Sequence, residues 1–323
     1  MTILVCGGAG YIGSHMVRYL RDAGFPVRVF DDLSTGHREA IHGIDLVVGR
    51  LQDPAALAEA FAPGDVDAVI HFAAKALVGE SVADPLLYFD NNVVGTLRLL
   101  EAMQRHAVRR LVFSSTCAVY GVPQAERLSE DLPKAPINPY GASKWICEQM
   151  IGDAARIGIR SVCLRYFNAA GAAVDGTIGE SHEPETHLIP NALRAALDPR
   201  RVLTVHGTDY PTADGTCVRD YVHVLDLARA HHLALEFLRT HEGAHAFNLG
   251  TEHGLSVMQV IEAVARIAGV TPRWQAGPRR DGDPPRLVAD SSRARNLLGW
   301  TPQLSSVDRI VGTALAWHTA QRY

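Results

Sequence analysis

Tyr140 and Lys144 are four residues apart at the start of a long helical segment, so the sequence places both side chains on one helix face. Tyrosine has an unperturbed pKa of about 10, and it acts as a base near neutral pH only beside a cation that favours the phenolate. Lys144 can supply that cation. The pair therefore indicates proton-transfer chemistry, provided that other segments bring a reactant to it.

Thr116 is a third polar group with a suitable position. It follows the apolar run 111–113, at the point where an expected strand ends. Parallel sheets bind ligands at the carboxyl ends of their strands. The Thr116 hydroxyl can donate a hydrogen bond to a sugar hydroxyl or accept one from it.

A glycine-rich turn, residues 7–13 (GGAGYIG), lies between the first expected strand and the first expected helix. A tight turn alone would account for the glycines. In this context, however, small residues also let the helix N-terminus approach a pyrophosphate. Asp31 ends the second expected strand, where its carboxylate can accept the adenosine ribose hydroxyls and would repel a 2′-phosphate. The motif predicts a dinucleotide site that prefers NAD to NADP.

Short β-rich apolar runs alternate with helical patterns along the first half of the chain. The expected strands are residues 3–6, 27–30, 46–48, 68–71, 111–113 and 161–164. Between them, apolar residues recur every three or four positions, as in residues 12–20 and 94–103. The alternation predicts an α/β fold, a Rossmann-like doubly wound parallel sheet, with a smaller loop-rich α/β substrate lobe.

We expect residues 1–165 to form the dinucleotide-binding domain and residues 166–323 to form mainly the substrate lobe. Residues 171–184 are rich in turn-forming residues and precede a helical pattern at 188–197. Residues 224–238 form an amphipathic pattern that can pack on the first lobe, so a segment of about 206–250 is expected to return to it.

Composition narrows the class of partner. Among 323 residues there are 31 Lys+Arg and 35 Asp+Glu, a net charge of −4, with no dense basic run, so neither nucleic acid nor an anionic membrane is expected. No targeting leader or membrane-length apolar stretch is present, and a cytoplasmic protein is expected. Five separated cysteines without C-x-x-C argue against disulfides and zinc knuckles. No H-E-x-x-H spacing occurs among the 15 histidines, so no metal is expected.

Further segments carry a family resemblance: HFAAKALVGESV at 71–82, NNVVGT at 91–96, LRYFN at 164–168, GTDYPT at 207–212, VRDYVH at 218–223 and RRDGD at 279–283. With the glycine turn and the tyrosine–lysine pair, the whole chain resembles the extended short-chain dehydrogenases/reductases, and within them the UDP-glucose 4-epimerase family. The glycine and tyrosine–lysine motifs are shared by the superfamily. Segments 75–80, 207–212 and 279–283 are more specific to the epimerases.

The resemblance implies an isomerase that epimerises a UDP-hexose at C4 through a transient 4-keto sugar, with NAD as cofactor. Tyr140 is then the base at the sugar 4-hydroxyl, Lys144 tunes it and holds the nicotinamide ribose, and Thr116 stands where the family has Ser or Thr. The implied cofactor contacts are Gly7, Gly10, Tyr11, Ile12, Gly13, Asp31, Asp32, Ser34, Thr35, Gly36, Leu51, Phe72, Ala73, Ala74, Lys75, Asn91 or Asn92, Tyr140, Lys144 and Phe167.

The resemblance also assigns the UDP-sugar side and a homodimer, joined through the helices after Pro85 and after Tyr140. Leu287 stands where strict glucose/galactose members carry a tyrosine, which implies room for the N-acetylated sugar pair as well. The implied substrate contacts are Lys75, Thr116, Tyr140, Asn168, His187, Leu188, Arg219, Arg280, Asp283 and Leu287. Arginine suits a diphosphate because its planar fork binds two phosphate oxygens at once.

Residues 49–53 (GRLQD) depart from the family pattern. The family usually has an aspartate that accepts a hydrogen bond from adenine, whereas this chain has Arg50, whose guanidinium carries no acceptor. Either the guanidinium stacks on the adenine, or Asp53 or the backbone of Leu51 takes the adenine edge.

Other functions remain open on sequence grounds. The substrate of a 4-epimerase can be a UDP-pentose or UDP-uronate. A nucleotide-sugar 4,6-dehydratase would need two acids after the threonine, but Cys117 and Ala118 follow Thr116, so its proton-transfer groups are missing. An NAD-sensing regulator on the same fold would lack the catalytic pair, and this chain has both Tyr140 and Lys144.

Overall fold

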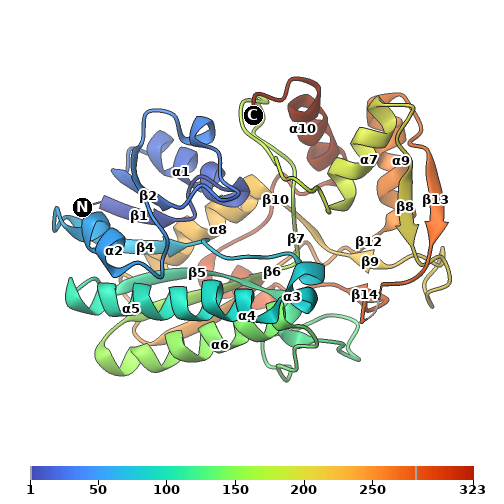
Figure 1. The fold of residues 1–323 in the computed structure, drawn as a ribbon. Helices are drawn as coiled ribbons and strands as arrows, with labels where there is room; N and C mark the ends of the chain where they lie inside the picture. The colour runs from blue at the N-terminus through green and yellow to red at the C-terminus, as the bar shows by residue number, and fades with distance from the viewer. Residues whose placement is uncertain (1, 281) are drawn as a thin grey trace.

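A seven-stranded parallel sheet forms the centre of the molecule (Figure 1). The computed structural model describes residues 2–280 and 282–323, so Met1 and Asp281, the latter within the 279–283 motif, lie outside the described residues. The strand order is β11-β6-β5-β4-β1-β2-β3. The strands are β1 (Thr2–Cys6), β2 (Val27–Asp31), β3 (Asp45–Val48), β4 (Val66–His71), β5 (Arg110–Thr116), β6 (Arg160–Tyr166) and β11 (Ala244–Leu249).

Helices cover both faces of this sheet, as the doubly wound prediction requires (Figure 1). Ile3 and Val5 of β1 pack with α1 (Tyr11–Asp22) and α8 (Val224–Phe237). Leu4 and Cys6 face the other way, toward α2 (Pro54–Phe61), α5 (Gly95–Arg105) and α6 (Pro139–Asp153). Every residue of β1 is buried, which explains its continuous apolar run.

The strand order reverses at β1, because β2 pairs with it on one side and β4 pairs with it on the other. The carboxyl ends of β1 and β4 therefore flank the point where the strand order reverses, which is the usual ligand position of such sheets. The glycine turn follows β1, and residues 72–77 follow β4. Residues 72–77 lead into α3 (Val78–Ala83), α4 (Pro85–Tyr88) and the π-helical turn η2 (Phe89–Val94).

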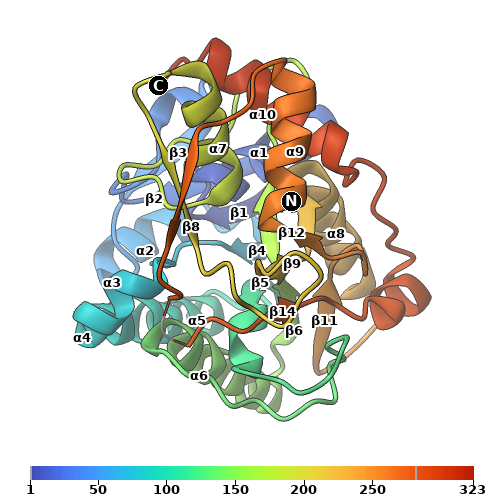
Figure 2. The ribbon, with the colours of Figure 1, turned by 90° about the vertical axis from the view of Figure 1, so that its right-hand side faces the viewer.

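A smaller lobe lies beside the carboxyl ends of the strands (Figures 1 and 2). Its core is formed by α7 (Leu188–Leu197), α9 (Val257–Ala268) and α10 (Val307–Thr319). Short strands complete it: β8 (Leu203–His206) with β13 (Trp274–Gly277), and β9 (Val218–Arg219) between β12 (Leu255–Ser256) and β14 (Arg286–Leu287). Figure 2 faces this lobe, with β8 and β13 side by side.

The chain passes between the lobes more than once. β7 (Asn168–Ala170) pairs with β10 (Tyr221–His223), directly after β6 and directly before α8. α8 then packs on α1, and β11 adds an edge strand to the central sheet. The remaining elements are the short helical turns η1 (Arg38–Ile41), η3 (Cys117–Tyr120), η4 (Ala154–Ile157) and η5 (Ala294–Leu298).

The α/β prediction, with its Rossmann-like parallel sheet, is confirmed. Each of the six strands expected from apolar runs lies within a strand of the central sheet. Within the described part of the chain, no helix combines the length and the apolar character needed to span a membrane.

Candidate active site

Tyr140, Lys144 and Thr116 meet at the carboxyl edge of the sheet. α6 begins at Pro139, with the Asn138 side chain accepting from the Gly141 N–H at 2.8 Å, so Tyr140 lies in its first turn. Thr116 is the last residue of β5, and its hydroxyl accepts from the Ala118 N–H at 3.1 Å. The structure thus brings the three residues predicted to be catalytic to one edge.

Burial shifts both titratable groups of the pair. It raises the pKa of Tyr140 to about 12, partly opposed by the Thr116 hydroxyl. It lowers the pKa of Lys144 to about 8. The Lys144 ammonium donates to the Ser114 carbonyl oxygen at 2.9 Å and lies 4.7 Å from the centre of the Phe113 ring. The tyrosine is therefore neutral by itself at neutral pH, and it needs added positive charge to act as a base.

A buried ion pair lies beneath this edge. The Glu148 carboxylate, one turn after Lys144 on α6, accepts from both Nε and Nη2 of Arg165 on β6, and from the Ser115 hydroxyl next to Thr116. Both side chains of the pair are 5% exposed. A buried charge pair with this many hydrogen bonds fixes the spacing of α6, β5 and β6, and with it the relative positions of the predicted catalytic residues.

The glycine turn shows which glycines the fold itself requires. Gly7 has φ +76°, and a Cβ there would lie 2.4 Å from the Ala73 nitrogen. A Cβ on Gly13 would lie 2.0 Å from the Gly7 oxygen. A Cβ on Gly10 would meet no protein atom closer than 3.5 Å. Packing explains the first two, whereas Gly10 faces space at the start of α1 where a pyrophosphate can approach.

Asp31 lies beside the glycine turn and also stabilises it through hydrogen bonds. Its two carboxylate oxygens accept from the Ala9 N–H at 2.9 Å and the Leu33 N–H at 2.8 Å. Burial raises its pKa, and the two backbone bonds oppose the rise. Each carboxylate oxygen has a second lone pair, so Asp31 can still accept from ribose hydroxyls. The nearby segment with Asp32, Ser34, Thr35 and Gly36 approaches the same turn, since a Cβ on Gly36 would lie 2.8 Å from that of Ala9.

The sequence indicates Asn91 or Asn92 as a cofactor contact, and Asn92 is the residue that fixes the segment after β4. It is 2% exposed, accepts from the Lys75 N–H at 2.9 Å, and donates to the Lys75 carbonyl at 3.1 Å and to the Ser143 hydroxyl at 3.0 Å. It thereby ties residues 72–77 to α6. Asn91 is half-buried and donates to the Asn92 side chain at 3.0 Å.

Arg50 is exposed, and its guanidinium lies 4.0 Å from the Asp32 carboxylate. Asp53 instead caps α2, accepting from the Ala55 N–H at 2.9 Å. Leu51 is buried against Gly95. The Asp53 carboxylate therefore already has a structural partner, which leaves Arg50 and the backbone of Leu51 as the stronger candidates to meet the adenine.

Apart from Lys75, Thr116 and Tyr140, the predicted substrate residues come from several segments that follow the first lobe in the chain. Arg219 is 9% exposed, and its guanidinium pairs with the Asp283 carboxylate and donates to the Pro284 carbonyl at 2.8 Å. Leu287, paired with Arg219 in the β9–β14 ladder, packs against the cluster that contains Cys117 and Phe167. Leu287 therefore lies close to the end of β5, where Thr116 is.

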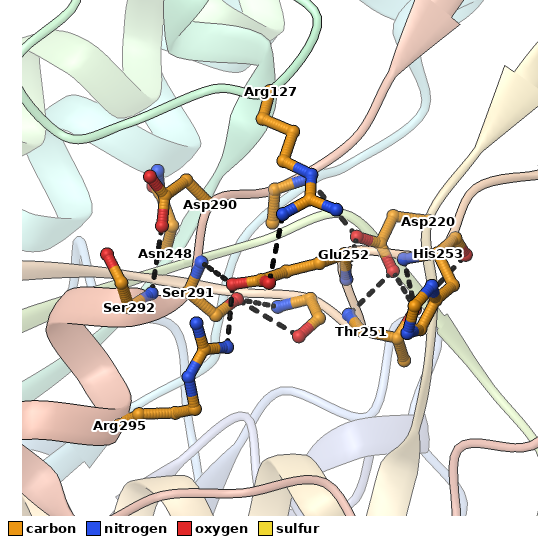
Figure 3. Close-up of polar contacts among 12 residues, drawn as sticks. Arg127, Asp220, Asn248, Thr251, Glu252, His253, Asp290, Ser291, Ser292 and Arg295 are labelled. Carbon is orange, nitrogen blue, oxygen red and sulfur yellow. Dashed lines mark hydrogen bonds and ion pairs between the residues drawn. The ribbon is translucent and has the colours of Figure 1, made fainter.

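Asp220 holds these segments together (Figure 3). It is fully buried, and its carboxylate accepts from the Thr251 N–H and hydroxyl, the Glu252 N–H and the Ala289 N–H at 2.6–3.1 Å. Its backbone carbonyl accepts from the Asn168 N–H at 3.0 Å. Figure 3 also shows Glu252, which accepts from Arg127, the Ser291 N–H and Arg295. The Asp220 carboxylate thus positions the segments next to β12 and β14, the two strands that flank Arg219 in the small sheet.

Comparison with known proteins places the chain in a family. Residues 3–250 match the NAD dependent epimerase/dehydratase family. The chain is 48% identical over 321 residues to the UDP-glucose 4-epimerase of Lacticaseibacillus casei, covering 98% of this chain and 97% of that protein. The chain belongs to the UDP-glucose 4-epimerases.

Solved structures agree with this assignment. The UDP-glucose 4-epimerase of Brucella ovis in complex with NAD superposes with a TM-score of 0.94 at 48% identity, covering 97% of each chain. The UDP-Glc/GlcNAc 4-epimerase of Campylobacter jejuni gives 0.85 at 40% identity, covering 98% of this chain and 99% of that one. The molecule is an NAD-dependent isomerase that epimerises UDP-hexoses at C4.

Within this epimerase, sequence reasoning missed four groups that the structure assembles. They are the Glu148–Arg165 ion pair, the hydrogen bonds of Asn92, the hydrogen bonds of the Asp220 carboxylate, and a cluster of two glutamates and two histidines at residues 180–187. A search for H-E-x-x-H cannot find the cluster at residues 180–187, because its residues have the spacing E-x-H-x-x-E-x-H and lie in a segment without helix or strand. The pattern E-P-E-T-H ahead of a helix was the available signal.

Proposed function

We propose that Tyr140 is the base of the 4-epimerisation, with Lys144 and Thr116 as its partners. The observation that carries this assignment is the meeting of a buried lysine, a tyrosine one helical turn away and a strand-end threonine at the edge where the glycine turn opens. The Tyr140 oxygen accepts the proton of the sugar 4-hydroxyl, and Thr116 orients that hydroxyl. The same oxygen returns a proton to the sugar when the opposite epimer forms.

The glycine turn and its surroundings fit NAD. Gly10 leaves space at the α1 N-terminus for the pyrophosphate, and Asp31 presents a carboxylate at the ribose position. NAD, when bound, supplies the hydride acceptor and donor for the sugar C4. Burial lowers the pKa of Lys144 to about 8, so it remains protonated below that pH. We assign this charge the role of favouring the Tyr140 phenolate in the loaded site. The other cofactor contacts implied by the family resemblance, from Gly7 to Phe167, are part of this proposal.

On the substrate side, we propose that Arg219 and Arg280 bind the diphosphate, with Asn168, His187, Leu188 and Asp283 around the UDP. Arg219 supports this role because Asp283 and the Pro284 carbonyl hold its guanidinium in one orientation. The direct experiment is incubation of purified protein with UDP-galactose without added NAD, followed by chromatographic separation of the products. Formation of UDP-glucose is expected. A 4,6-dehydratase would instead release a deoxy-keto sugar.

We further propose that the enzyme accepts N-acetylated hexoses. Leu287 packs in the cluster with Cys117 and Phe167, and leucine is smaller than the tyrosine of strict glucose/galactose enzymes. The C. jejuni relative is a UDP-Glc/GlcNAc 4-epimerase. The measurement is kcat/KM with UDP-galactose and with UDP-N-acetylglucosamine, where activity on both pairs is expected.

Two organisational proposals complete the assignment. Residues 1–165, joined again by α8 and β11, form the NAD-binding domain, and residues 166–323 form mainly the UDP-sugar lobe. A homodimer through the helices after Pro85 and after Tyr140 is supported by apolar side chains on the first of these helices and on α5, since Leu86 is 76% exposed and Leu97 is 40% exposed. Light scattering after size-exclusion chromatography tests the dimer.

A further inference from the structure

Residues 171–187, between β7 and α7, form a long segment without a helix or strand. Segments of this length without secondary structure are uncommon in compact domains, and they often carry a function. Four side chains that can bind a metal converge at the end of this one, from Glu180, His182, Glu185 and His187. Their ligand atoms all lie within 4.8 Å of one another.

The buried Glu180 carboxylate is the centre of this cluster. It is 4% exposed, and its Oε1 meets Nδ1 of His182 at 3.2 Å and Nδ1 of His187. The two imidazole rings stand edge to face, with centroids 5.7 Å apart. Both histidines therefore direct the same ring nitrogen at one carboxylate oxygen, so the two nitrogens and this oxygen lie together around one small volume.

Glu185 supplies a second carboxylate with an unsatisfied atom. One of its oxygens, Oε1, accepts from the His187 N–H at 2.9 Å. Its Oε2 is buried and has no hydrogen-bond partner among the described residues. An unpaired carboxylate oxygen beside another buried carboxylate is unfavourable unless a cation neutralises it. Protonated histidines or a divalent ion can do so.

We propose that Glu180, His182, Glu185 and His187 bind one zinc ion, which fixes the 171–187 segment. Two imidazole nitrogens and two carboxylate oxygens are ligands that zinc takes, whereas calcium and magnesium prefer oxygen alone. Zinc bonds of about 2.0–2.2 Å in a tetrahedron place ligand atoms roughly 3.4 Å apart. Side-chain movements of about an ångström bring the most widely separated ligand atoms, which lie within 4.8 Å of each other, to that distance. Four protein ligands leave no open position, so the ion is structural.

The position of the cluster gives the ion a use. The Trp317 indole on α10 donates to the Glu180 carbonyl at 2.8 Å, and His187 is the residue that precedes α7. The ion would thus fasten the segment to two helices of the smaller lobe. Ligation through Nδ1 leaves Nε2 of His187 able to donate to the substrate, so the site is compatible with the role proposed above but does not depend on it.

The test uses tag-free, NAD-loaded protein that has been dialysed against a chelator. Titration with ZnCl2, by calorimetry and by metal analysis after desalting, is expected to give one zinc per chain. Co2+ in place of zinc is expected to give the visible absorption of a tetrahedral site. His182→Ala should weaken zinc binding by at least about a hundredfold, since even outer-shell changes cost 10–100-fold. His182→Cys, which restores a ligand, should recover most of the affinity.

His42→Ala is the matched control, because His42 is an exposed histidine outside the cluster. Circular dichroism and NAD content show that each variant is folded. The proposal is overturned if wild type binds no stoichiometric zinc, or if His182→Ala binds zinc as wild type does. Either result would identify the cluster as a proton-linked hydrogen-bond network. UDP-galactose turnover is measured separately, so a failed epimerase assignment and a failed zinc assignment remain distinguishable.

Discussion

The buried charge of Lys144 lowers the free energy of unfolding. Replacing Lys144 by an uncharged residue is therefore expected to stabilise the protein and to abolish the proposed chemistry. The lysine is 3% exposed, and burial lowers its pKa from 10.5 to about 8. The folded state therefore binds fewer protons than the unfolded state between pH 8 and 10.5, and stability rises with pH across that window. Below pH 8 the full penalty is present.

The magnitude follows from this difference. One pKa unit corresponds to 1.36 kcal/mol, so holding Lys144 charged at pH 7 costs the fold about 3 kcal/mol. Methionine has a similar length and no charge, but it loses the 2.9 Å hydrogen bond to the Ser114 carbonyl. That loss costs about 1 kcal/mol. Lys144→Met should therefore raise the free energy of unfolding at pH 7 by about 2 kcal/mol.

The assay is urea unfolding of NAD-stripped protein at pH 7 and pH 9.5, for wild type and Lys144→Met. The advantage of the variant should be smaller at pH 9.5, because wild-type Lys144 is then largely neutral when folded. Lys134→Met is the control: this lysine also donates to a backbone carbonyl, that of Leu132 at 2.6 Å, and burial also lowers its pKa, but its side chain is only half-buried, so a smaller gain is expected. A Lys144→Met protein that is less stable than wild type by the same amount at both pH values would refute the reasoning.

Four further predictions test other parts of the site. Tyr140→Phe should lower kcat by about 10² to 10⁴-fold with NAD content unchanged, because only the ionisable oxygen is lost; more than a tenth of wild-type activity would contradict the assigned base. Arg50→Asp should keep or raise NAD content, since the carboxylate restores the adenine acceptor that the family usually has and the lost ion pair with Asp32 is long, at 4.0 Å; a clear loss of NAD would show that the guanidinium contacts the cofactor. Leu287→Tyr should reduce kcat/KM for UDP-N-acetylglucosamine far more than for UDP-galactose, and an unchanged ratio, or no wild-type rate with the acetylated sugar, would disprove the pocket-wall role. Asp220→Asn should destabilise the fold by about 1–3 kcal/mol and weaken UDP binding more than NAD binding, because one carboxylate oxygen becomes a donor that faces backbone N–H groups; equal losses for both ligands in calorimetry would argue against a local effect.

The central sheet was predictable because its inner strands are buried on both faces. Burial on both faces requires continuous apolar runs, and such runs stand out in the sequence, as in β1 and β4. β11 escaped notice because it lies at the sheet edge and reads AHAFNL, a mixed run. The strands of the smaller lobe are two to four residues long, which is too short for any periodic signal.

The proposed catalytic residues were predictable because their motifs are local. Tyr140 and Lys144 lie on one helix, and the glycine turn is continuous in sequence. The supporting contacts join segments that are far apart in the chain, as when Asn92 reaches Ser143 or Glu148 reaches Arg165. Polar residues with such partners resemble surface residues in the sequence, so only the folded chain identifies them.

Asp220 lies at the centre of the segments that we propose to bind the substrate. β9, β12 and β14 have two residues each, and such short strands cannot hold their positions through ladder bonds alone. The four bonds to the Asp220 carboxylate replace the missing ladder, and they join the loop after β11 to the segment after β14. Arg219 precedes this carboxylate in β9, and Leu287 pairs with Arg219 across the ladder. The proposed diphosphate ligand Arg219 and the proposed pocket-wall residue Leu287 therefore depend on the same buried carboxylate, and we expect a change at Asp220 to alter both together.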